Sequence, residues 1–406
     1  MRVLVVGSGG REHALAWALS RSPMLTALYV APGNTGTAQV GQNLPVSVTD
    51  LDGLVHAAVQ HAIDLVVVGP EGPLVAGLAD RMAAAGIRCF GPNAAAARLE
   101  GSKAFTKQVA DEAGIPTAQW EQFNDPAAAH AFIRRRGTPV VIKADGLAGG
   151  KGVVVAATLD EALAAADAAL AAGPVVIEEC LTGPEISLFA LCGGVDAVLL
   201  GTARDHKRVG DGDTGPNTGG MGAVAPVPGF DGAAALDVFV RPALRVMATR
   251  GTPFRGVLFA GLMLTPDGPR LLEYNVRFGD PECQALLPLL ATDLLPVLVA
   301  ACDNRLDTVR PDWHPGATAA VVMAQRGYPG VLEGAGPIGG LNRAGLVFHG
   351  ATRTEDGQVM ADGGRVLTLV GVGPNAAAAR RAAYAGVAAI DWPGGFCRRD
   401  IGGADV

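Results

Sequence analysis

The chain has 406 residues, of which 49% are hydrophobic and 17% charged, and its formal net charge is −7. This length allows several domains, and the composition indicates a globular protein rather than a disordered one. The acidic balance disfavours general nucleic-acid binding, and no apolar run is long enough to predict a membrane span. Six scattered cysteines without a Cys-x-x-Cys pair favour free thiols and a cytoplasmic location. Met1 runs straight into an apolar segment, so we expect no signal segment.

Strands and helices are predicted to alternate over the first hundred residues. Apolar runs predict strands at 2–7, 26–32, 63–74 (ending in a loop) and 87–92. Residues 12–20 have the pattern of a helix. Such alternation indicates a doubly wound parallel sheet, and we place a domain boundary near Gly101.

The rest of the chain predicts a second domain at 102–310 and a third at 311–406. The expected elements are a helix at 104–115, a hairpin at 138–158, a helix at 159–173, a strand at 174–181, two strands at 185–194 and 197–207, two more joined by a turn at 266–268, a helical stretch at 283–303, and short strands from about 318 closed by a helix at 375–390. Residues 209–222, VGDGDTGPNTGGMG, predict a long glycine-rich loop, and such loops inside compact domains are commonly functional.

The opening stretch VLVVGSGGREH has the start of a dinucleotide-binding fingerprint. Gly7 and Gly9 fit G-x-G-x-x-G, but Glu12 stands at the third glycine, and the second strand ends in Ala31-Pro32 instead of an acid. What remains is a set of backbone amides at a helix start, suited to a single phosphate, with Arg11 as a further charge. A tight turn without a ligand is the alternative at this stage.

Lysine is rare, with five residues against 27 arginines, and all five lie between Lys103 and Lys207. The chain either keeps lysine where a compact ammonium is needed or has this distribution by chance. The stretch KADGLAGGKG fails as a Walker A motif because Asp145 stands at its first glycine and Gly152 at its Ser/Thr. A glycine-rich hairpin tip can still cover a triphosphate, with Lys143 and Lys151 beside it. The alternative is an exposed, flexible hairpin.

The stretch LLEYNVRFGDPE carries the strongest chemical signal. In a strand, Glu273 and Asn275 share one face, and their oxygens suit Mg²⁺ that also contacts phosphates. Arg277 extends that face and can bind a carboxylate with two donors. A weaker signal is VVIEECLTGPE, in which the backbone of residues 178–181 can pair with an adenine edge and Glu185 with ribose hydroxyls.

Together these motifs resemble the ATP-grasp superfamily and, within it, the phosphoribosylamine–glycine ligases. The family resemblance rests on ordered strings: GSGGREHALAWAL, APGNTGTA, VVGPEGPLVAGLAD, FGPN, LEGSKAFTK, IKADGLAGGKGVVVA, DHKRVGDGDTGPNTGGMGA and EYNVRFGDPECQ. It implies an α/β ATP-grasp fold with an N-terminal doubly wound domain at 1–101, an ATP-grasp domain at 102–310 with a mobile lid at about 118–182, and a small β-rich domain at 311–406. We expect the single-function form of the ligase.

The resemblance implies a reaction in de novo purine synthesis. ATP, glycine and 5-phosphoribosylamine give glycinamide ribonucleotide, ADP and phosphate through a glycyl phosphate, with Mg²⁺ or Mn²⁺ as the metal. Such a path needs positioning and charge neutralisation, which agrees with the lysines, hard oxygens and glycine loops. The partners are small molecules, and we expect a monomer that binds neither nucleic acid nor membrane.

The resemblance also implies roles for single residues. ATP contacts are implied for Lys103, Lys143, Lys151, Glu178, Glu179, Leu181 and Glu185, with adenine held mainly by backbone. Metal contacts are implied for Glu273 and Asn275. Substrate contacts are implied for Gly9, Gly10, Arg11, Glu71, Lys207, Asp213, Asn217, Thr218 and Arg277, with the sugar phosphate at residues 7–11 and 69–71. Catalytic roles are implied for Lys151, Asp213 and Arg277, whereas Lys107 is interpreted as a helix-surface residue.

Three alternatives have a sequence feature that separates them from this hypothesis. A related ATP-grasp ligase that uses formate or bicarbonate is disfavoured by DTGPNTGGMG. A nicotinamide-dependent oxidoreductase needs the third glycine and the acid that are missing. A non-catalytic nucleotide sensor would tolerate loss of the lysines, Glu273 or Asn275, and all are present.

Overall fold

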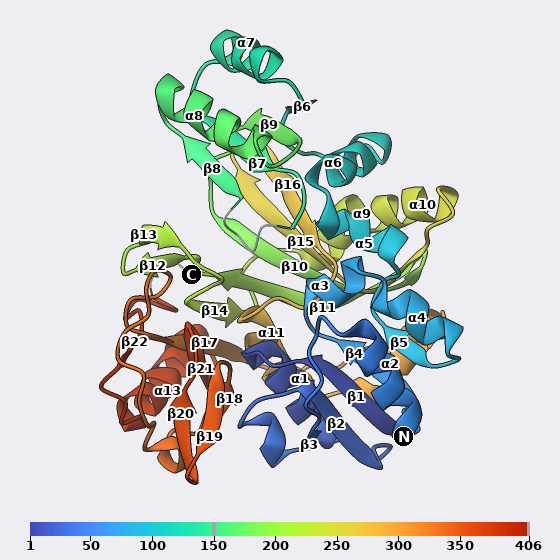
Figure 1. Ribbon diagram of the computed structural model, residues 1–406, viewed down its shortest axis with the longest axis vertical. Helices are drawn as coiled ribbons and strands as arrows, with labels where there is room; N and C mark the ends of the chain where they lie inside the picture. Colours follow the sequence, from blue (N-terminus) through green and yellow to red (C-terminus); the bar gives the residue numbers. More distant parts are fainter. Residues whose placement is uncertain (148–151, 404–406) are drawn as a thin grey trace.

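The computed structural model describes residues 1–147 and 152–403, which form three regions around two large sheets (Figure 1). The first region is a parallel sheet of order β3-β2-β1-β4-β5, which confirms the doubly wound prediction. Its strands are β1 (Arg2–Gly7), β2 (Ala27–Pro32), β3 (Gln42–Asn43), β4 (Leu65–Val68) and β5 (Arg88–Phe90). Its helices are α1 (Gly10–Ser20), η1 (Thr37–Gln39), α2 (Leu51–Gln60), α3 (Glu71–Val75), α4 (Leu78–Ala84) and α5 (Ala94–Gly101). Strands β1 and β4 are apolar because helices cover both faces of the sheet.

One predicted strand is partly wrong. The strand expected at 63–74 ends at Val68, and Glu71–Val75 forms the short helix α3. Pro70 is extended and stands at the N-cap, while Glu71 places a negative charge in the first turn, where the helix dipole favours it. The apolar residues after Gly69 therefore belong to a helix packed on α5.

A small four-stranded sheet, which we call the lid, lies at the top of Figure 1. Its order is β6-β9-β7-β8, and α7 and α8 pack on it. The elements are β6 (Trp120–Phe123), α7 (Pro126–Arg136), β7 (Val140–Ala144), β8 (Val153–Ala156), α8 (Leu159–Leu170) and β9 (Val175–Glu179). Antiparallel pairing of β7 with β8 confirms the predicted hairpin. Lys151, at its glycine-rich tip, lies outside the described residues.

The largest sheet runs from the lid side into the C-terminal region, in the order β16-β15-β10-β11-β14-β17-β21-β18, with β22 on β17. Its strands are β10 (Glu185–Gly194), β11 (Asp196–Asp205), β14 (Gly222–Ala225), β15 (Phe254–Thr265), β16 (Gly268–Asn275), β17 (Ala317–Gln325), β18 (Leu346–His349), β21 (Arg365–Gly373) and β22 (Gly395–Phe396). The helices are α6 (Lys103–Glu112), α9 (Gly232–Phe239), α10 (Arg241–Thr249), α11 (Glu282–Leu286), η2 (Leu287–Leu289), α12 (Leu294–Cys302), η3 (Leu306–Thr308), η4 (Leu341–Arg343) and α13 (Ala376–Ala389). Because β14 pairs with β17, this sheet crosses the boundary predicted at 311.

Two other predictions in this region need correction. The segment 209–222 is not irregular throughout, because β12 (Arg208–Gly210) pairs with β13 (Thr214–Asn217) as a small ribbon, as β19 (Thr352–Glu355) does with β20 (Gln358–Ala361). The helical stretch expected at 283–303 is interrupted between η2 and α12. Pro288 lacks a donor, and Asp293 caps the new helix by accepting the N–H of Leu295 at 3.0 Å. Among the described residues, no helix combines the length and apolarity that crossing a membrane requires.

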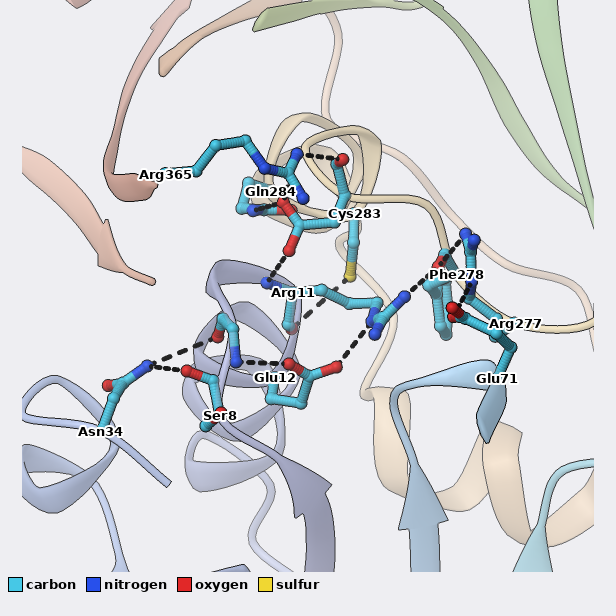
Figure 2. Close-up of polar contacts among 12 residues, drawn as sticks. Ser8, Arg11, Glu12, Asn34, Glu71, Arg277, Phe278, Cys283, Gln284 and Arg365 are labelled. Carbon is cyan, nitrogen blue, oxygen red and sulfur yellow. Dashed lines mark hydrogen bonds and ion pairs between the residues drawn. The ribbon is translucent and has the colours of Figure 1, made fainter. Parts of the chain in front are cut away.

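The N-terminal and C-terminal regions meet at two buried histidines. His13 on α1 accepts the backbone N–H of His349 through Nδ1 at 2.8 Å. Asn34 donates to the carbonyl of Ser8 at 2.8 Å (Figure 2). It also donates to the carbonyl of His349 at 2.7 Å, and so joins the opening loop to β18. Burial lowers the pKa of His13 to about 3 and that of His349 to about 4. Both rings are therefore neutral at pH 7.

We predict that acid weakens this junction. A histidine whose pKa is about 3 when folded and about 6.5 when unfolded does not affect stability above pH 6.5, where both states are neutral. It destabilises the fold increasingly as the pH falls, because the unfolded state takes up a proton that the folded state does not. For His13 the loss is about 2 kcal/mol of unfolding free energy between pH 7 and pH 5. Denaturant unfolding at both pH values should show a smaller loss for His13→Gln than for the wild type. His56→Gln, on exposed α2 surface, should match the wild type, and equal losses in all three proteins would contradict the prediction.

Candidate active site

The predicted metal ligands lie at the end of β16, facing several cations. Burial opposes ionisation of Glu273, but the charges of Lys207, Lys143 and Lys103 lower its pKa. Within the described residues, the Glu273 carboxylate forms no direct hydrogen bond or ion pair. Asn275 is buried, and its Oδ1 accepts from Arg277 Nη2 at 3.2 Å. An ionised carboxylate without a partner among the described residues, next to an amide oxygen, fits the oxygen ligands that a divalent metal prefers.

Arg277 does not present its guanidinium as a free fork. Its Nε lies 3.0 Å from Glu71 Oε2, and its Nη2 lies 3.0 Å from Glu100 Oε1 (Figure 2 shows the pair with Glu71). Glu71 and Arg277, both predicted to contact substrate, therefore neutralise each other. Burial opposes ionisation of Glu71, but Arg277 and Arg11 lower its pKa. Burial raises the pKa of Glu100 even with Arg277 beside it.

The lid contributes a buried set of charges around Glu178, which is 2% exposed. Glu178 forms an ion pair with Lys143, whose Nζ also donates to the carbonyl of Leu272 at 3.3 Å. Its other oxygen lies 2.5 Å from Lys107 Nζ. The interpretation of Lys107 as a surface residue is wrong, because it is 1% exposed and α6 packs beneath the lid there. The Glu178 side chain is thus a structural charge as well as a neighbour of the predicted adenine backbone site.

Glu179 and Leu181 lie on either side of the end of β9. Glu179 Oε2 accepts the N–H of Gln119 at 3.3 Å, and Leu181 is half-buried in the loop before β10. Glu185, at the start of β10, forms an ion pair with Lys207. Burial lowers the pKa of Lys207, but Glu185, Asp205 and Glu273 raise it above its ordinary value. The predicted ribose and substrate contacts are thus adjacent.

Lys103 lies at the start of α6, where the lid hairpin meets it. Its Nζ donates to the carbonyl of Gly146 at 2.8 Å, and its backbone N–H donates to Asp145 Oδ1 at 2.6 Å. Asp145 also accepts from the hydroxyl of Ser102 at 3.0 Å. A carboxylate at a helix N-terminus is favourable, so Asp145 ties the glycine-rich hairpin to α6.

The β12–β13 ribbon places its predicted substrate residues in different settings. Thr218 donates its hydroxyl to the carbonyl of Lys207 at 2.8 Å, and so fixes the ribbon next to that lysine. Asn217 is exposed on β13. Asp213 has a φ of 53° and lies 2.6 Å from Arg398 Nη1, whose side chain is 2% exposed. The structure therefore gives Asp213 a partner on the C-terminal segment and does not bring it into contact with Glu273.

The carboxylate of Glu12, just after the opening loop, occupies the space beside the glycines of that loop. Glu12 Oε2 accepts the N–H of Gly9 at 2.6 Å, and Oε1 lies 2.6 Å from Arg11 Nε. A Cβ at Gly69 would stand 1.9 Å from Glu12 Oε1, so Glu12 fills the space that a third fingerprint glycine leaves open. Arg11 is buried and turns toward the Phe278 carbonyl, 3.1 Å away (Figure 2). Its side chain is not aimed at a ligand site in front of the loop.

A cavity of about 270 Å³ lies between this loop and the C-terminal region. Gly9 and Gly10 line one side, and Arg365, Thr368 and Tyr328 line the other. Arg365 Nη1 donates to the carbonyls of Asp280 at 2.6 Å and Gly219 at 2.7 Å, so it connects the cavity to the ribbon (Figure 2 shows Arg365 approaching α11). Sequence reasoning missed Arg365, which lies in the C-terminal string GGRVLTL.

Comparison with known proteins places these features in a family. Models of the N, ATP-grasp (A) and C domains of phosphoribosylglycinamide synthetase match residues 1–100, 101–283 and 318–404. The chain is 52% identical to phosphoribosylamine–glycine ligase of Mesorhizobium japonicum, covering 99% of this chain and 98% of that protein. It is 46% identical to the enzyme of that name from Escherichia coli K12, with the same coverage.

Comparison with solved structures agrees with these sequence matches. The crystal structure of phosphoribosylamine–glycine ligase from Thermotoga maritima has a TM-score of 0.88 and 34% identity, covering 98% of this chain and 100% of that one. Biotin carboxylase from Campylobacter jejuni, as a β,γ-ATP complex, has a TM-score of 0.74 at 15% identity, covering 97% and 92%. This second likeness shows the fold alone.

A four-stranded sheet next to lysines and a Glu-x-Asn strand, in a chain whose residues 101–283 match the ATP-grasp domain model, defines an ATP-grasp enzyme. Enzymes of this class use ATP with a divalent metal ion. The matches to three domain models and the identities of 52% and 46% to curated relatives narrow this class to one family. The chain belongs to the phosphoribosylamine–glycine ligase family, whose members are carbon–nitrogen ligases of purine biosynthesis.

Proposed function

We propose that the chain ligates glycine to 5-phosphoribosylamine through a glycyl phosphate. A glycine carboxylate oxygen forms a bond to the γ-phosphorus of ATP, and ADP leaves. The amine of phosphoribosylamine then forms the amide bond, gives up a proton and expels phosphate. The observation that carries this proposal is the Glu273 carboxylate, which has no hydrogen bond or ion pair to any residue that the structure describes and lies in the field of Lys103, Lys143 and Lys207.

Glu273 and Asn275 are the residues that would hold Mg²⁺ or Mn²⁺. No group of three or more His, Cys, Asp or Glu side chains is arranged to bind a metal in the part of the chain that the structure describes. Two protein oxygens completed by phosphates and water suit Mg²⁺. When bound, such an ion neutralises charge that develops on the phosphoryl oxygens. Lys103 and Lys143 add positive charge next to the same position.

The reaction is tested by supplying substrates in turn. Purified protein with Mg²⁺ should release ADP steadily only when glycine and phosphoribosylamine are both present. Steady ADP release with either substrate left out would count against the proposal. Glycine-dependent exchange of label from ADP into ATP without phosphoribosylamine would support the glycyl phosphate.

We further propose that the sugar phosphate binds in the cavity between the opening loop and β21. The N–H groups of Gly9 and Arg11 already donate to the carboxylates of Glu12 and Asp280. The loop amides alone are therefore a weaker phosphate site than the sequence indicated. Arg365, whose Nη1 lies 3.3 Å from Asp280 Oδ1, places a guanidinium at the opposite wall of the cavity.

Replacing Arg365 by methionine should weaken binding of the sugar phosphate. Loss of one charged hydrogen bond corresponds to about 10- to 100-fold in affinity. Inhibition by ribose 5-phosphate, competing with phosphoribosylamine, measures this directly, and the KM for ATP should stay within about twofold. Arg353→Met, an exposed arginine on β19, serves as the control. An unchanged inhibition constant in Arg365→Met would place the sugar phosphate elsewhere.

A further inference from the structure

Helix α6 lies where the lid, β16 and the body of the protein meet (Figure 1). Lys107, in the second turn of this helix, is almost fully buried there. Its Nζ donates to Thr117 Oγ1 at 2.7 Å, and Thr117 donates in turn to the Leu271 carbonyl on β16 at 2.7 Å. The same Nζ lies 2.5 Å from Glu178 Oε2 on β9. Lys107 therefore joins the lid to the strand that carries Glu273.

The charges at this junction do not cancel. Glu178 contacts two ammonium groups, Lys107 on one oxygen and Lys143 on the other. All three groups are buried, with side-chain exposures of 2% for Glu178 and Lys107 and 7% for Lys143. Counted by themselves, these three side chains carry one negative and two positive charges. The other carboxylate that interacts with the charge of Lys143 is Glu273, which the proposed metal ion would neutralise. Keeping an uncompensated ion out of water is costly, so such an arrangement calls for an anion that completes it.

Lys143 is the member of the set that can meet this anion. Lys143 and Lys103 both act electrostatically on Glu273, the proposed metal ligand, whereas Lys107 faces Glu178 and Thr117. Burial lowers the pKa of Lys107, and Glu178 opposes that effect. Lys107 thus serves Glu178, whereas Lys143 is shared between Glu178 and the region of Glu273.

We propose that Lys107 is a positioning residue that neutralises Glu178, so that the ammonium of Lys143 remains available to an ATP phosphate. This inference rests on the proposed ATP site. Without Lys107, Glu178 would have Lys143 as its single counter-ion. The Lys143 ammonium would then be held on the carboxylate, and the attraction for the triphosphate would fall. The adenosine part of ATP, which carries no charge, would be little affected.

The experiment separates these two parts of the ligand. Equilibrium binding of ATP and of adenosine is measured on the full-length protein with Mg²⁺. The dissociation constant of adenosine divided by that of ATP reports the contribution of the triphosphate. Lys107→Met, which removes the charge and keeps a long side chain, should lower this ratio about tenfold or more. Its adenosine affinity should stay within about threefold of the wild type.

A second variant distinguishes positioning from folding. The double variant Lys107→Met with Glu178→Gln removes both charges, which leaves Lys143 without a competing carboxylate. Its ratio should return to within about threefold of the wild-type value. Any contact of Glu178 with adenine affects ATP and adenosine alike and cancels in the ratio. A merely structural role for Lys107 would leave the double variant as weak as Lys107→Met.

The remaining outcomes are equally decisive. If Lys143→Met lowers the ratio to about one and Lys107→Met leaves it at the wild-type value, the proposed ATP site is supported and the inference about Lys107 is overturned. If Lys107→Met lowers the affinity for both ligands equally, Lys107 supports the fold and does not tune Lys143. If Lys143→Met leaves the ratio at its wild-type value, the proposed ATP site itself is wrong, and the inference is lost with it.

Discussion

Replacing Glu273 by glutamine is expected to lower kcat by at least about 100-fold. Changes in groups that only support a metal ligand already cost about 10- to 100-fold, and Glu273 is proposed to be a ligand itself. The glutamine keeps the shape of the side chain but loses the charge that Lys103, Lys143 and Lys207 surround. Turnover measured against Mg²⁺ concentration should show a weaker apparent metal affinity as well as the lower rate.

The same substitution should leave the fold nearly unchanged. Glu273 has no direct ion pair within the described residues, whereas the nearby lysines have other partners. Lys143 contacts Glu178, Lys207 contacts Glu185, and Lys103 donates to Gly146. The thermal midpoint of Glu273→Gln should therefore lie within about 2 °C of the wild type. Glu121→Gln, on the exposed edge of the lid, is the matched control for rate. A fall in midpoint of 5 °C or more with partial activity would make Glu273 a structural residue.

Local pattern was enough to predict most strands near the site. The side-chain period of two predicted that Glu273 and Asn275 share a face of β16, and turn residues predicted where β15 ends and β16 begins. Apolar runs between glycines predicted the parallel sheet. These features depend only on residues close together in the chain, so they can be predicted from a single sequence. The assignment of single residues to ATP or substrate came from resemblance and stays a prediction.

Contacts between distant segments could not be predicted in this way. Lys107 has a polar side chain on a helix, and it is buried where Thr117 and Glu178, the latter distant in the chain, contact its ammonium. Glu71 and Arg277 are far apart in the chain, and each alone looks like a substrate contact. The scarcity of lysine was the one signal available, since the four described lysines all engage carboxylates or carbonyls.

Replacing Arg277 by methionine is expected to lower the unfolding free energy by about 3 kcal/mol, because removing one partner of a buried ion pair leaves the other charge uncompensated. The side chains concerned are 17% exposed for Arg277 and 8% for Glu100. Denaturant unfolding measures the loss. Arg305→Met removes an exposed pair with Asp303, in which Arg305 is 62% exposed, and should change the value by less than about 0.5 kcal/mol.

The pH dependence of this loss identifies the charge responsible. Burial raises the pKa of Glu100, and Arg277 is the charge that opposes this effect. Without Arg277 the pKa of Glu100 should rise further. A carboxyl whose pKa is raised on folding destabilises the folded state above that pKa and less so as the pH falls. The deficit of Arg277→Met relative to the wild type should therefore shrink between pH 7 and pH 5, and Glu100→Gln in the same background should remove part of it at pH 7. If Arg277→Met is as stable as the wild type and only the KM for glycine rises, Arg277 binds substrate directly and the ion pairs with Glu71 and Glu100 are incidental.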